Sequence, residues 1–218
     1  QPDGVTDELL DMFNHPKVCR YLDMPLQHVC PGVLRRMGRA GGDEEFRKLV
    51  DKVRSRVPGI ALRTSLMVGF PGEDRLAFKQ LLDFVRDVRL DWVSVFIYSP
   101  EEGTRAASMR DGCSPETAAR RAEMLRDAQE EIMREKAASL KGTVVRALVE
   151  GPSEMAPDYL EARSCREAPD IDGVIFIGGV VPEPVPGFHR VLIEDSDGID
   201  LLGRVIGEEG DGVRGIGG

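Results

Sequence analysis

The segment IALRTSLMVGFPGE, residues 60–73, decides how the first part of this 218-residue chain is interpreted. Residues 60–68 are mostly apolar and of strand length, and a Gly/Pro turn and a helical pattern follow them. That order predicts a buried parallel strand that leads through a turn into a helix. Because backbone N–H groups and helix N-termini converge at the carboxyl ends of such strands, we expect a ligand to bind at this turn.

The turn itself, GFPGE at residues 69–73, has the composition of a loop that approaches a ligand. Glycines let the main chain come close to a bound molecule, and Pro71 rigidifies the turn. We expect Glu73 in the first turn of the following helix, where the helix dipole favours a carboxylate. An ordinary strand-to-helix turn has the same composition, so the neighbouring segments must decide.

Those neighbours continue an alternation of strands and helices. Residues 18–27 and 91–98 read as strands, and residues 43–57 and the segment after residue 73 have apolar side chains at helical spacing. Short helices are expected at residues 6–14 and 31–42, and a long charged helix at residues 114–140. The pattern is typical of right-handed β-α-β units, so an α/β fold with a parallel sheet is predicted.

After residue 141 the sequence changes character. Five short runs of alternating apolar and polar residues, separated by Gly and Pro, occupy residues 143–151, 159–164, 173–179, 188–195 and 201–207. They predict a small all-β barrel. We therefore expect three parts: an α/β domain with a long bridging helix at residues 1–141, a barrel at residues 142–206, and a mobile Gly-rich tail at residues 207–218.

Composition bounds the class of protein. No apolar run is long enough to span a bilayer and the N-terminus is not a signal peptide, so a soluble, cytoplasmic protein is expected. Cys19, Cys30, Cys113 and Cys165 are far apart and lack CxxC or CxxxCxxC spacing. Free thiols, and no metal site, are expected within this sequence.

Charge is distributed unevenly along the chain. Residues 1–141 contain 23 Lys and Arg against 23 Asp and Glu, whereas residues 142–218 contain 6 against 15, so the net charge of −9 arises entirely in the second part. Nucleic-acid affinity comes mainly from basic residues, and the acidic second domain therefore argues against RNA as a partner. A basic partner fits it better.

Several motifs together resemble one family. These are YLDMPLQH (21–28), the opening segment (60–73), VFIYSPEEGTRAA (95–107), REAPDIDGVIFI (166–177) and DLLGRV (200–205). In register over nearly the whole chain, they resemble the ribosomal-protein methylthiotransferases (RimO), radical S-adenosylmethionine (SAM) enzymes of the MiaB/RimO group. YSPEEGT and PLQH favour the ribosomal-protein branch over the tRNA-modifying branch.

The resemblance implies both a fold and a reaction. The fold is a radical SAM partial TIM barrel of (β/α) units followed by a TRAM-type β-barrel. An electron from an iron–sulfur cluster cleaves SAM to a 5′-deoxyadenosyl radical, which abstracts hydrogen from the β-carbon of an aspartate on a small-subunit ribosomal protein; a methylthio group is then installed. The family's three-cysteine loop and its second cluster domain are expected upstream of residue 1. We therefore expect the 4Fe–4S clusters to be held by that N-terminal part, and this chain by itself to be inactive.

The resemblance also suggests which residues line the cofactor cavity. Gln27 could bond the ribose or aminoacyl group, or tie a loop to the backbone. Arg63 lies in an apolar strand and needs a carboxylate partner, either that of the cofactor, which we favour slightly, or a structural Asp or Glu. Tyr98 could stack, donate a hydrogen bond or simply pack. The complete predicted set is Gln27, Arg63, Gly69, Phe70, Pro71, Gly72, Tyr98 and Ser99.

The other polar residues are expected mainly to have structural or surface roles. Arg35, Arg36 and Arg39 are expected to form a solvated helix face, and His15 and His28 to be structural. In the second domain, Glu194, Asp195, Asp197 and Asp200 are expected to cluster in a loop. They could steer a basic ribosomal protein toward the enzyme or merely keep the surface soluble.

Two alternatives to a ribosomal-protein methylthiotransferase remain open. A tRNA methylthiotransferase of the MiaB type shares the chemistry, although a basic second domain would be expected of it. A non-catalytic binding module could use the same two domains without performing chemistry.

Overall fold

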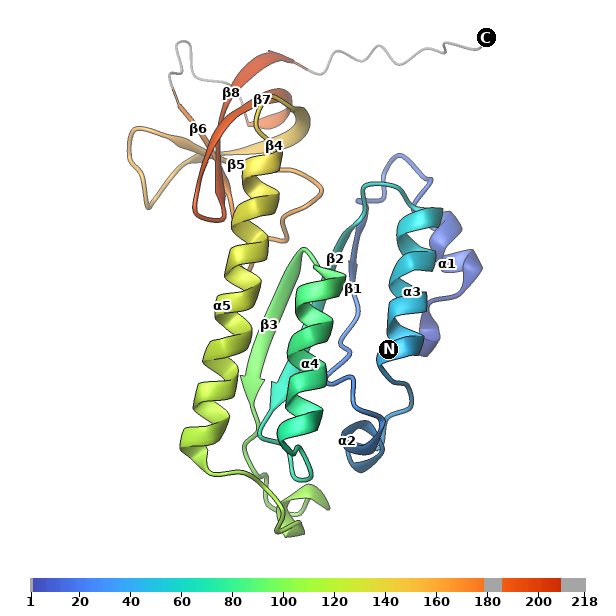
Figure 1. The fold of residues 1–218 in the computed structure, drawn as a ribbon. Coiled ribbons are helices and arrows are strands. Elements are labelled where there is room, and N and C mark those ends of the chain that lie inside the picture. The colour runs from blue at the N-terminus through green and yellow to red at the C-terminus, as the bar shows by residue number, and fades with distance from the viewer. Residues whose placement is uncertain (1, 179–185, 209–218) are drawn as a thin grey trace. The chain divides into compact units, whose positions relative to one another are not determined.

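The computed structural model describes residues 2–178 and 186–208. The chain folds as two units, Gln1–Ile132 and Met133–Gly218, whose boundary lies within helix α5 (Pro115–Ser139) (Figure 1). No helix among the described residues is long and apolar enough to cross a membrane. The α/β-plus-all-β class expected from the sequence is confirmed.

A parallel sheet of order β1-β2-β3 forms the centre of the first unit. Its strands are β1 (Tyr21–Asp23), β2 (Ala61–Val68) and β3 (Trp92–Ile97). The helices are α1 (Asp7–Met12), α2 (Pro31–Arg36), α3 (Asp43–Arg56), α4 (Arg75–Val88) and the first part of α5, with short 3-10 turns at Pro2–Gly4 and Ala106–Ser108. Each strand leads into a helix, as the alternating pattern predicts.

Strand β1 is shorter than the ten residues expected from the sequence. Regular pairing ends at Asp23, and the chain rejoins β2 at a single bridge between Gln27 and Leu66. Pro25 has no N–H to donate, and the next amide, that of Leu26, donates to the Thr64 hydroxyl instead of to a ladder carbonyl. The Thr64 hydroxyl therefore accepts the hydrogen bond that a backbone carbonyl of β2 would accept in a regular strand pair.

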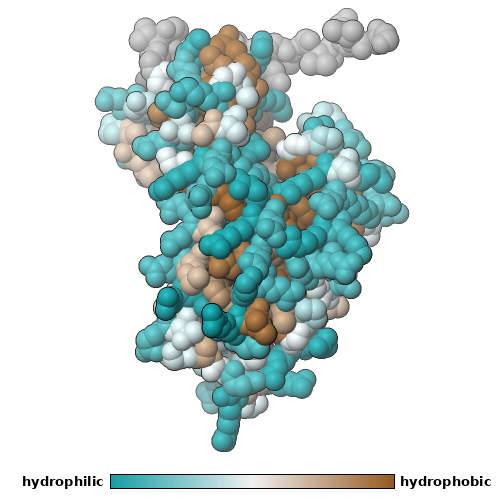
Figure 2. Space-filling model, viewed as in Figure 1, coloured by the Kyte–Doolittle hydropathy of each residue, from teal (hydrophilic) through white to brown (hydrophobic). Residues whose placement is uncertain are grey.

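The two faces of the sheet differ. Leu62, Leu66 and Val68 of β2 are fully buried, whereas Arg63 and Met67 between them are partly exposed. Helices α3 and α4 cover the buried face (Figure 1), because their apolar positions recur at helical spacing and join the same core. Figure 2 shows the result: mostly polar residues on the visible surface. The other face of the sheet carries the half-exposed side chains.

The second unit is a closed barrel with strand order β4-β5-β6-β8-β7. The strands are β4 (Val144–Pro152), β5 (Leu160–Arg163), β6 (Ile175–Ile177), β7 (Gly187–Asp197) and β8 (Asp200–Glu208). All pairings are antiparallel except that of β6 with β8. Alternate residues turn inward and form a separate apolar core, so the predicted barrel is confirmed. Of the tail expected to be mobile, residues 207 and 208 belong to β8, and residues 209–218 lie outside the described part.

Gly203 in β8 is a position where the barrel leaves no room for a side chain. A Cβ atom there would lie 2.7 Å from Val191 Cγ1 and 2.9 Å from the Leu192 carbonyl oxygen. We expect Gly203→Ala to lower the free energy of unfolding of the barrel by about 1–3 kcal/mol through overpacking. Gly207→Ala in the same strand is the control, because no atom lies within 4 Å of its Cβ position. Chemical denaturation would measure both, and equal stabilities would contradict the prediction.

Candidate functional site

The uncovered face of the sheet carries a mixed set of side chains. Paired residues of neighbouring parallel strands point to the same side of the sheet. On this face, Ser65 of β2 is paired with Ser94 of β3, and Met67 is paired with Phe96. The Phe96 side chain is 53% exposed. Polar groups therefore occupy the middle of the face and apolar groups its carboxyl edge, which is the kind of surface that binds a partly apolar ligand.

Arg63 lies on this face and is fully engaged. One guanidinium nitrogen, Nη1, donates to Asp23 Oδ2 at 2.7 Å, and Nη2 donates to Ser94 Oγ at 2.7 Å. Two kinds of carboxylate partner were expected for Arg63, one from the cofactor and one from the protein. The described residues supply the second kind, Asp23. Contact between Arg63 and a cofactor carboxylate stays a prediction.

Gln27 has an unusual backbone conformation. Its φ is +67°, a left-handed value that costs a residue other than glycine roughly 1–3 kcal/mol. Its N–H donates to the Ser65 carbonyl at 2.9 Å, and its carbonyl accepts from the Met67 N–H at 2.7 Å. The main chain thus ties this loop to β2 at the carboxyl end of the sheet, and the Gln27 side chain lines a cavity there.

The turn after β2 requires its glycines. Gly69 and Gly72 have φ of +79° and +91°. A Cβ at Gly69 would lie 2.8 Å from Ala118 Cβ on α5, and one at Gly72 would meet the Arg36 side chain. The main chain can therefore pass between α2 and α5 only without side chains at these two positions.

Aromatic rings lie beside this turn. The Phe70 ring, 5% exposed, packs edge-on against Tyr98 with centroids 4.9 Å apart. The Tyr98 hydroxyl is buried and has no hydrogen-bond partner among the described residues. A buried hydroxyl without a partner is costly, so the Tyr98 Oη atom has hydrogen-bonding capacity that the described residues do not use.

The buried carboxylate of Glu73 holds the turn after β2 in place. Glu73 is not in the first turn of α4 as expected: Asp74 is the N-cap, accepting from the Ala77 N–H at 2.8 Å, and Glu73 precedes it. The Glu73 side chain is fully buried and turns back. Its Oε2 accepts from the Gly69 N–H at 2.9 Å, and its Oε1 accepts from Arg121 Nη1 at 2.6 Å. Burial raises the pKa of the Glu73 carboxyl, while Arg121 and the Gly69 N–H oppose the rise.

His28 completes this buried group. Its Nδ1 accepts from the Cys30 N–H at 2.9 Å, so the proton lies on Nε2, which is 3.7 Å from Glu73 Oε2. Burial first, and the nearby Arg121 charge second, lower the pKa of His28 to about 4. His28 is therefore a neutral histidine at physiological pH.

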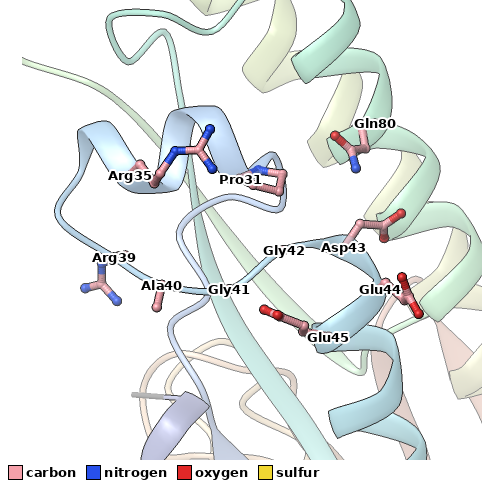
Figure 3. Close-up of a pocket in the computed structure, with 10 residues that line it drawn as sticks. All are labelled: Pro31, Arg35, Arg39, Ala40, Gly41, Gly42, Asp43, Glu44, Glu45 and Gln80. Atoms are coloured by element: carbon pink, nitrogen blue, oxygen red, sulfur yellow. The ribbon is translucent and has the colours of Figure 1, made fainter.

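Two cavities open near these elements. One, of about 480 Å³, is lined by Gln27, Arg36, Met37, Gly38, Arg39, Met67, Phe70, Arg105 and Ala106. The other, of about 490 Å³, lies between α2 and the start of α3 (Figure 3). There Arg35 and Arg39 share the walls with Asp43, Glu44 and Glu45, so charges of both signs are present and no ligand class is indicated.

The structure brings together only part of the predicted cofactor set. Gln27 and Phe70 share the 480 Å³ cavity, with Tyr98 packed against Phe70. Pro71 is buried, Ser99 is exposed beyond the end of β3, and Arg63 lies four residues before Met67 on β2. The link from Glu73 to Arg121 was missed, because 48 residues separate the two and no motif spacing signals it.

The acidic residues of the barrel are arranged differently from the prediction. Glu194, Asp195 and Asp197 belong to β7 and Asp200 begins β8, so they form a hairpin and not a loop. Ion pairs join Glu194 to Arg204 at 2.6 Å and Asp195 to Lys141 at 3.2 Å. Asp200 accepts from the Val174 N–H. The expected loop was wrong because backbone pairing between β7 and β8 continues to Asp197 and Asp200, although residues 194–197 are all polar and carry no strand pattern.

Metal ligands do not cluster in the part of the chain that the structure describes. No group of three or more His, Cys, Asp or Glu side chains is placed to hold a metal ion there. Cys19 and Cys165 are exposed, and Cys30 and Cys113 are partly exposed free thiols. The residues present do not fit an iron–sulfur cluster.

Together, the two units define a protein with an α/β unit built on a parallel sheet and an appended TRAM-type barrel: a family model described as "TRAM domain" matches residues 142–206. Over 94% of its length, the chain is 43% identical to "Ribosomal protein uS12 methylthiotransferase RimO" of Geobacter sulfurreducens and 42% identical to the protein of that name in Geotalea uraniireducens. The chain is homologous to these RimO methylthiotransferases, and the resemblance inferred from the motifs is confirmed.

The matched region has a limited extent in the relatives. The chain spans about half the length of the curated relatives it matches, 46% in both cases. Among solved structures, the radical SAM enzyme coproporphyrinogen III oxidase (HemN) from Escherichia coli gives a TM-score of 0.48 at 18% identity, covering 76% of this chain and 45% of that one. A similarity of that extent is too weak to bear on function.

The buried Glu73–Arg121 pair gives a prediction about stability. Replacing Glu73 by Gln leaves the Arg121 guanidinium, 12% exposed, without its carboxylate. We expect a loss of about 3–5 kcal/mol in the free energy of unfolding, because an uncompensated buried charge remains. Asp83→Asn, which breaks the exposed pair with Lys79, is the control and should change stability by less than about 1 kcal/mol. Urea unfolding of the three proteins checks this; a Glu73→Gln protein as stable as the control would refute it.

Proposed function

We propose that this chain is part of a radical SAM methylthiotransferase that adds a methylthio group to the β-carbon of an aspartate in ribosomal protein uS12. The observation that carries the proposal is the 43% identity, over 94% of this chain, with a uS12 methylthiotransferase. The two units supply different parts of this activity: the α/β unit contributes to the cofactor cavity, and the TRAM-type barrel recognises the substrate. The reaction takes place in the cytoplasm.

The α/β unit has a set of residues that fits SAM. Tyr98 Oη is a buried hydroxyl without a partner among the described residues, and Gln27, with its strained backbone, lies at the same edge. Phe70 supplies an apolar wall, and the main chain of the Gly69–Gly72 turn can approach closely because no Cβ is present at its two ends. SAM, when bound, supplies the hydrogen-abstracting group of the reaction. The 4Fe–4S clusters are held by protein outside this sequence.

The barrel carries the acidic charge that suits a basic ribosomal protein. Residues 142–218 contain 15 acidic and 6 basic residues. In the β7–β8 hairpin, Glu194 and Asp195 are ion-paired, while Asp197 is exposed and makes no ion pair among the described residues. Asp197 is therefore the carboxylate of this set that is most available to a basic partner, and electrostatic attraction raises the association rate with it.

The reaction itself is tested with the longer protein that contains this sequence. After reconstitution of its clusters without oxygen, it is incubated with SAM, reductant and either uS12 or tRNA, and each product is analysed by mass spectrometry. We expect a methylthio group on the ribosomal protein only. Modification of tRNA would assign the chain to the tRNA branch, and binding of either partner without SAM cleavage would favour a non-catalytic module. Reactions that lack SAM are the control.

Substrate recognition by the hairpin gives a second test. Reversing the charge with Asp195→Lys and Asp197→Lys should weaken binding to uS12 at low salt by roughly tenfold, because two attractive contacts become repulsive, and the effect should fade as salt screens them. Asp158→Lys, at another exposed site of the barrel, is the control. Fluorescence anisotropy at two salt concentrations measures the affinities. Unchanged binding of the double variant would show that these carboxylates only keep the surface soluble.

A further inference from the structure

The 480 Å³ cavity at the carboxyl edge of the sheet has an unusual charge. Three of its lining residues are arginines, Arg36, Arg39 and Arg105, and no Asp or Glu is among the lining residues that the structure describes. Residues 1–141, which include the cavity, contain 23 basic and 23 acidic residues. A lining with three arginines and no described Asp or Glu therefore departs from the charge balance of this part of the chain.

The three arginines differ in how their charge is compensated. Arg36 pairs with Asp111 at 2.8 Å. Arg39 donates to the Pro25 carbonyl at 3.3 Å and makes no ion pair within the described residues, although it also lines the neighbouring cavity beside Asp43, Glu44 and Glu45. The Arg105 side chain is exposed and has no hydrogen bond or ion pair within the described residues. Two of the three guanidinium groups thus have no ion pair among the described residues, and they favour an anionic ligand.

The rest of the lining restricts the ligand further. Met37, Met67 and Phe70 give the cavity an apolar side, and Gln27 adds an amide that can donate or accept. A small carboxylate on an aliphatic stem matches this combination, since its oxygens can reach the guanidinium groups while its carbons contact the methionines. A guanidinium binds a carboxylate with two parallel hydrogen bonds, which fixes the orientation of that carboxylate.

We propose that the Arg36–Arg39–Arg105 cavity is a carboxylate-binding subsite that positions one of the reactants at the carboxyl edge of the sheet. This inference rests on the proposed function, under which two reactants carry such a group: the acidic side chain of the protein substrate and the aminoacyl part of SAM. Arg105 is the residue that makes the first contact, because its guanidinium is already unpaired. Arg36 is a positioning residue, held in place by Asp111.

Met37 and Met67 are built-in reporters for a test of this proposal. With ¹³C-methyl methionine in the full chain, N-acetyl-aspartate amide is titrated and the methyl signals of Met37 and Met67 are followed by NMR. N-acetyl-asparagine amide, which has the same shape without the charge, is the matched ligand control. We expect the aspartate compound to shift both signals, and the asparagine compound to bind roughly tenfold more weakly or not at all.

Two variants assign the effect to the cavity. Arg105→Gln should weaken binding of the carboxylate by roughly tenfold, whereas Arg110→Gln, at an exposed arginine that does not line the cavity, should leave it unchanged. Both side chains are exposed, so folding is preserved and is checked on the same methionine spectra. Equal binding of the two amino-acid amides together with equal binding of SAM and its decarboxylated analogue, or equal affinity of the Arg105→Gln and Arg110→Gln proteins for the carboxylate that binds, would overturn the proposal.

A second pair of ligands identifies the source of the carboxylate. SAM and its decarboxylated analogue are titrated in the same way. Carboxylate-dependent shifts with the aspartate amide assign the subsite to the protein substrate, and shifts that require the SAM carboxylate assign it to the cofactor. If neither ligand shows carboxylate dependence, the cavity is not such a subsite. These measurements need no methylthiolation, so their failure is distinguishable from failure of the proposed reaction, which the product assay decides.

Discussion

The buried carboxylate of Glu73 makes the interactions on which the carboxyl edge of the sheet in the first unit depends. It bonds the Gly69 N–H and the Arg121 guanidinium, and His28 Nε2 lies 3.7 Å away. These contacts join the turn after β2, helix α5 and the loop after β1 at one point inside the protein. Since the group has no access to solvent, each partner is required by the others, and the turn is held in one conformation.

The contacts of Glu73 determine how the turn after β2 lies at the carboxyl edge of the sheet. The turn is held so close to α5 that Gly69 touches Ala118, and on its other side Gly72 packs against Arg36. Arg36 then occupies a wall of the 480 Å³ cavity, anchored by Asp111. The same constraint that stabilises the turn therefore places positive charge beside Gln27 and Met67. Glu73 and His28 are buried and Arg121 is nearly so, whereas Arg36 and Arg105 are exposed at the cavity.

Charge serves different purposes in the two units. In residues 1–141 the numbers of acidic and basic residues balance, and several of them form ion pairs, whereas three arginines line one cavity without a described Asp or Glu among its lining residues. In the barrel, acidic residues exceed basic ones, and the hairpin pairs that do form, Glu194–Arg204 and Lys141–Asp195, consume part of that excess. The first unit is thus balanced in charge, and the second is acidic.

The sequence by itself determined the order of strands and helices, the change of architecture near residue 141 and the family, because apolar periodicity, Gly/Pro turns and motifs are local signals. Only the tertiary structure decided which residues from distant segments of the sequence contact one another. The partners of Glu73 and Arg63 come from segments 48 and 40 residues away, and the strained φ of Gln27 arises only when its loop bonds to β2. The arginines from α2, the loop after it and the segment near residue 105 share a cavity because the parallel sheet brings its carboxyl ends to one edge.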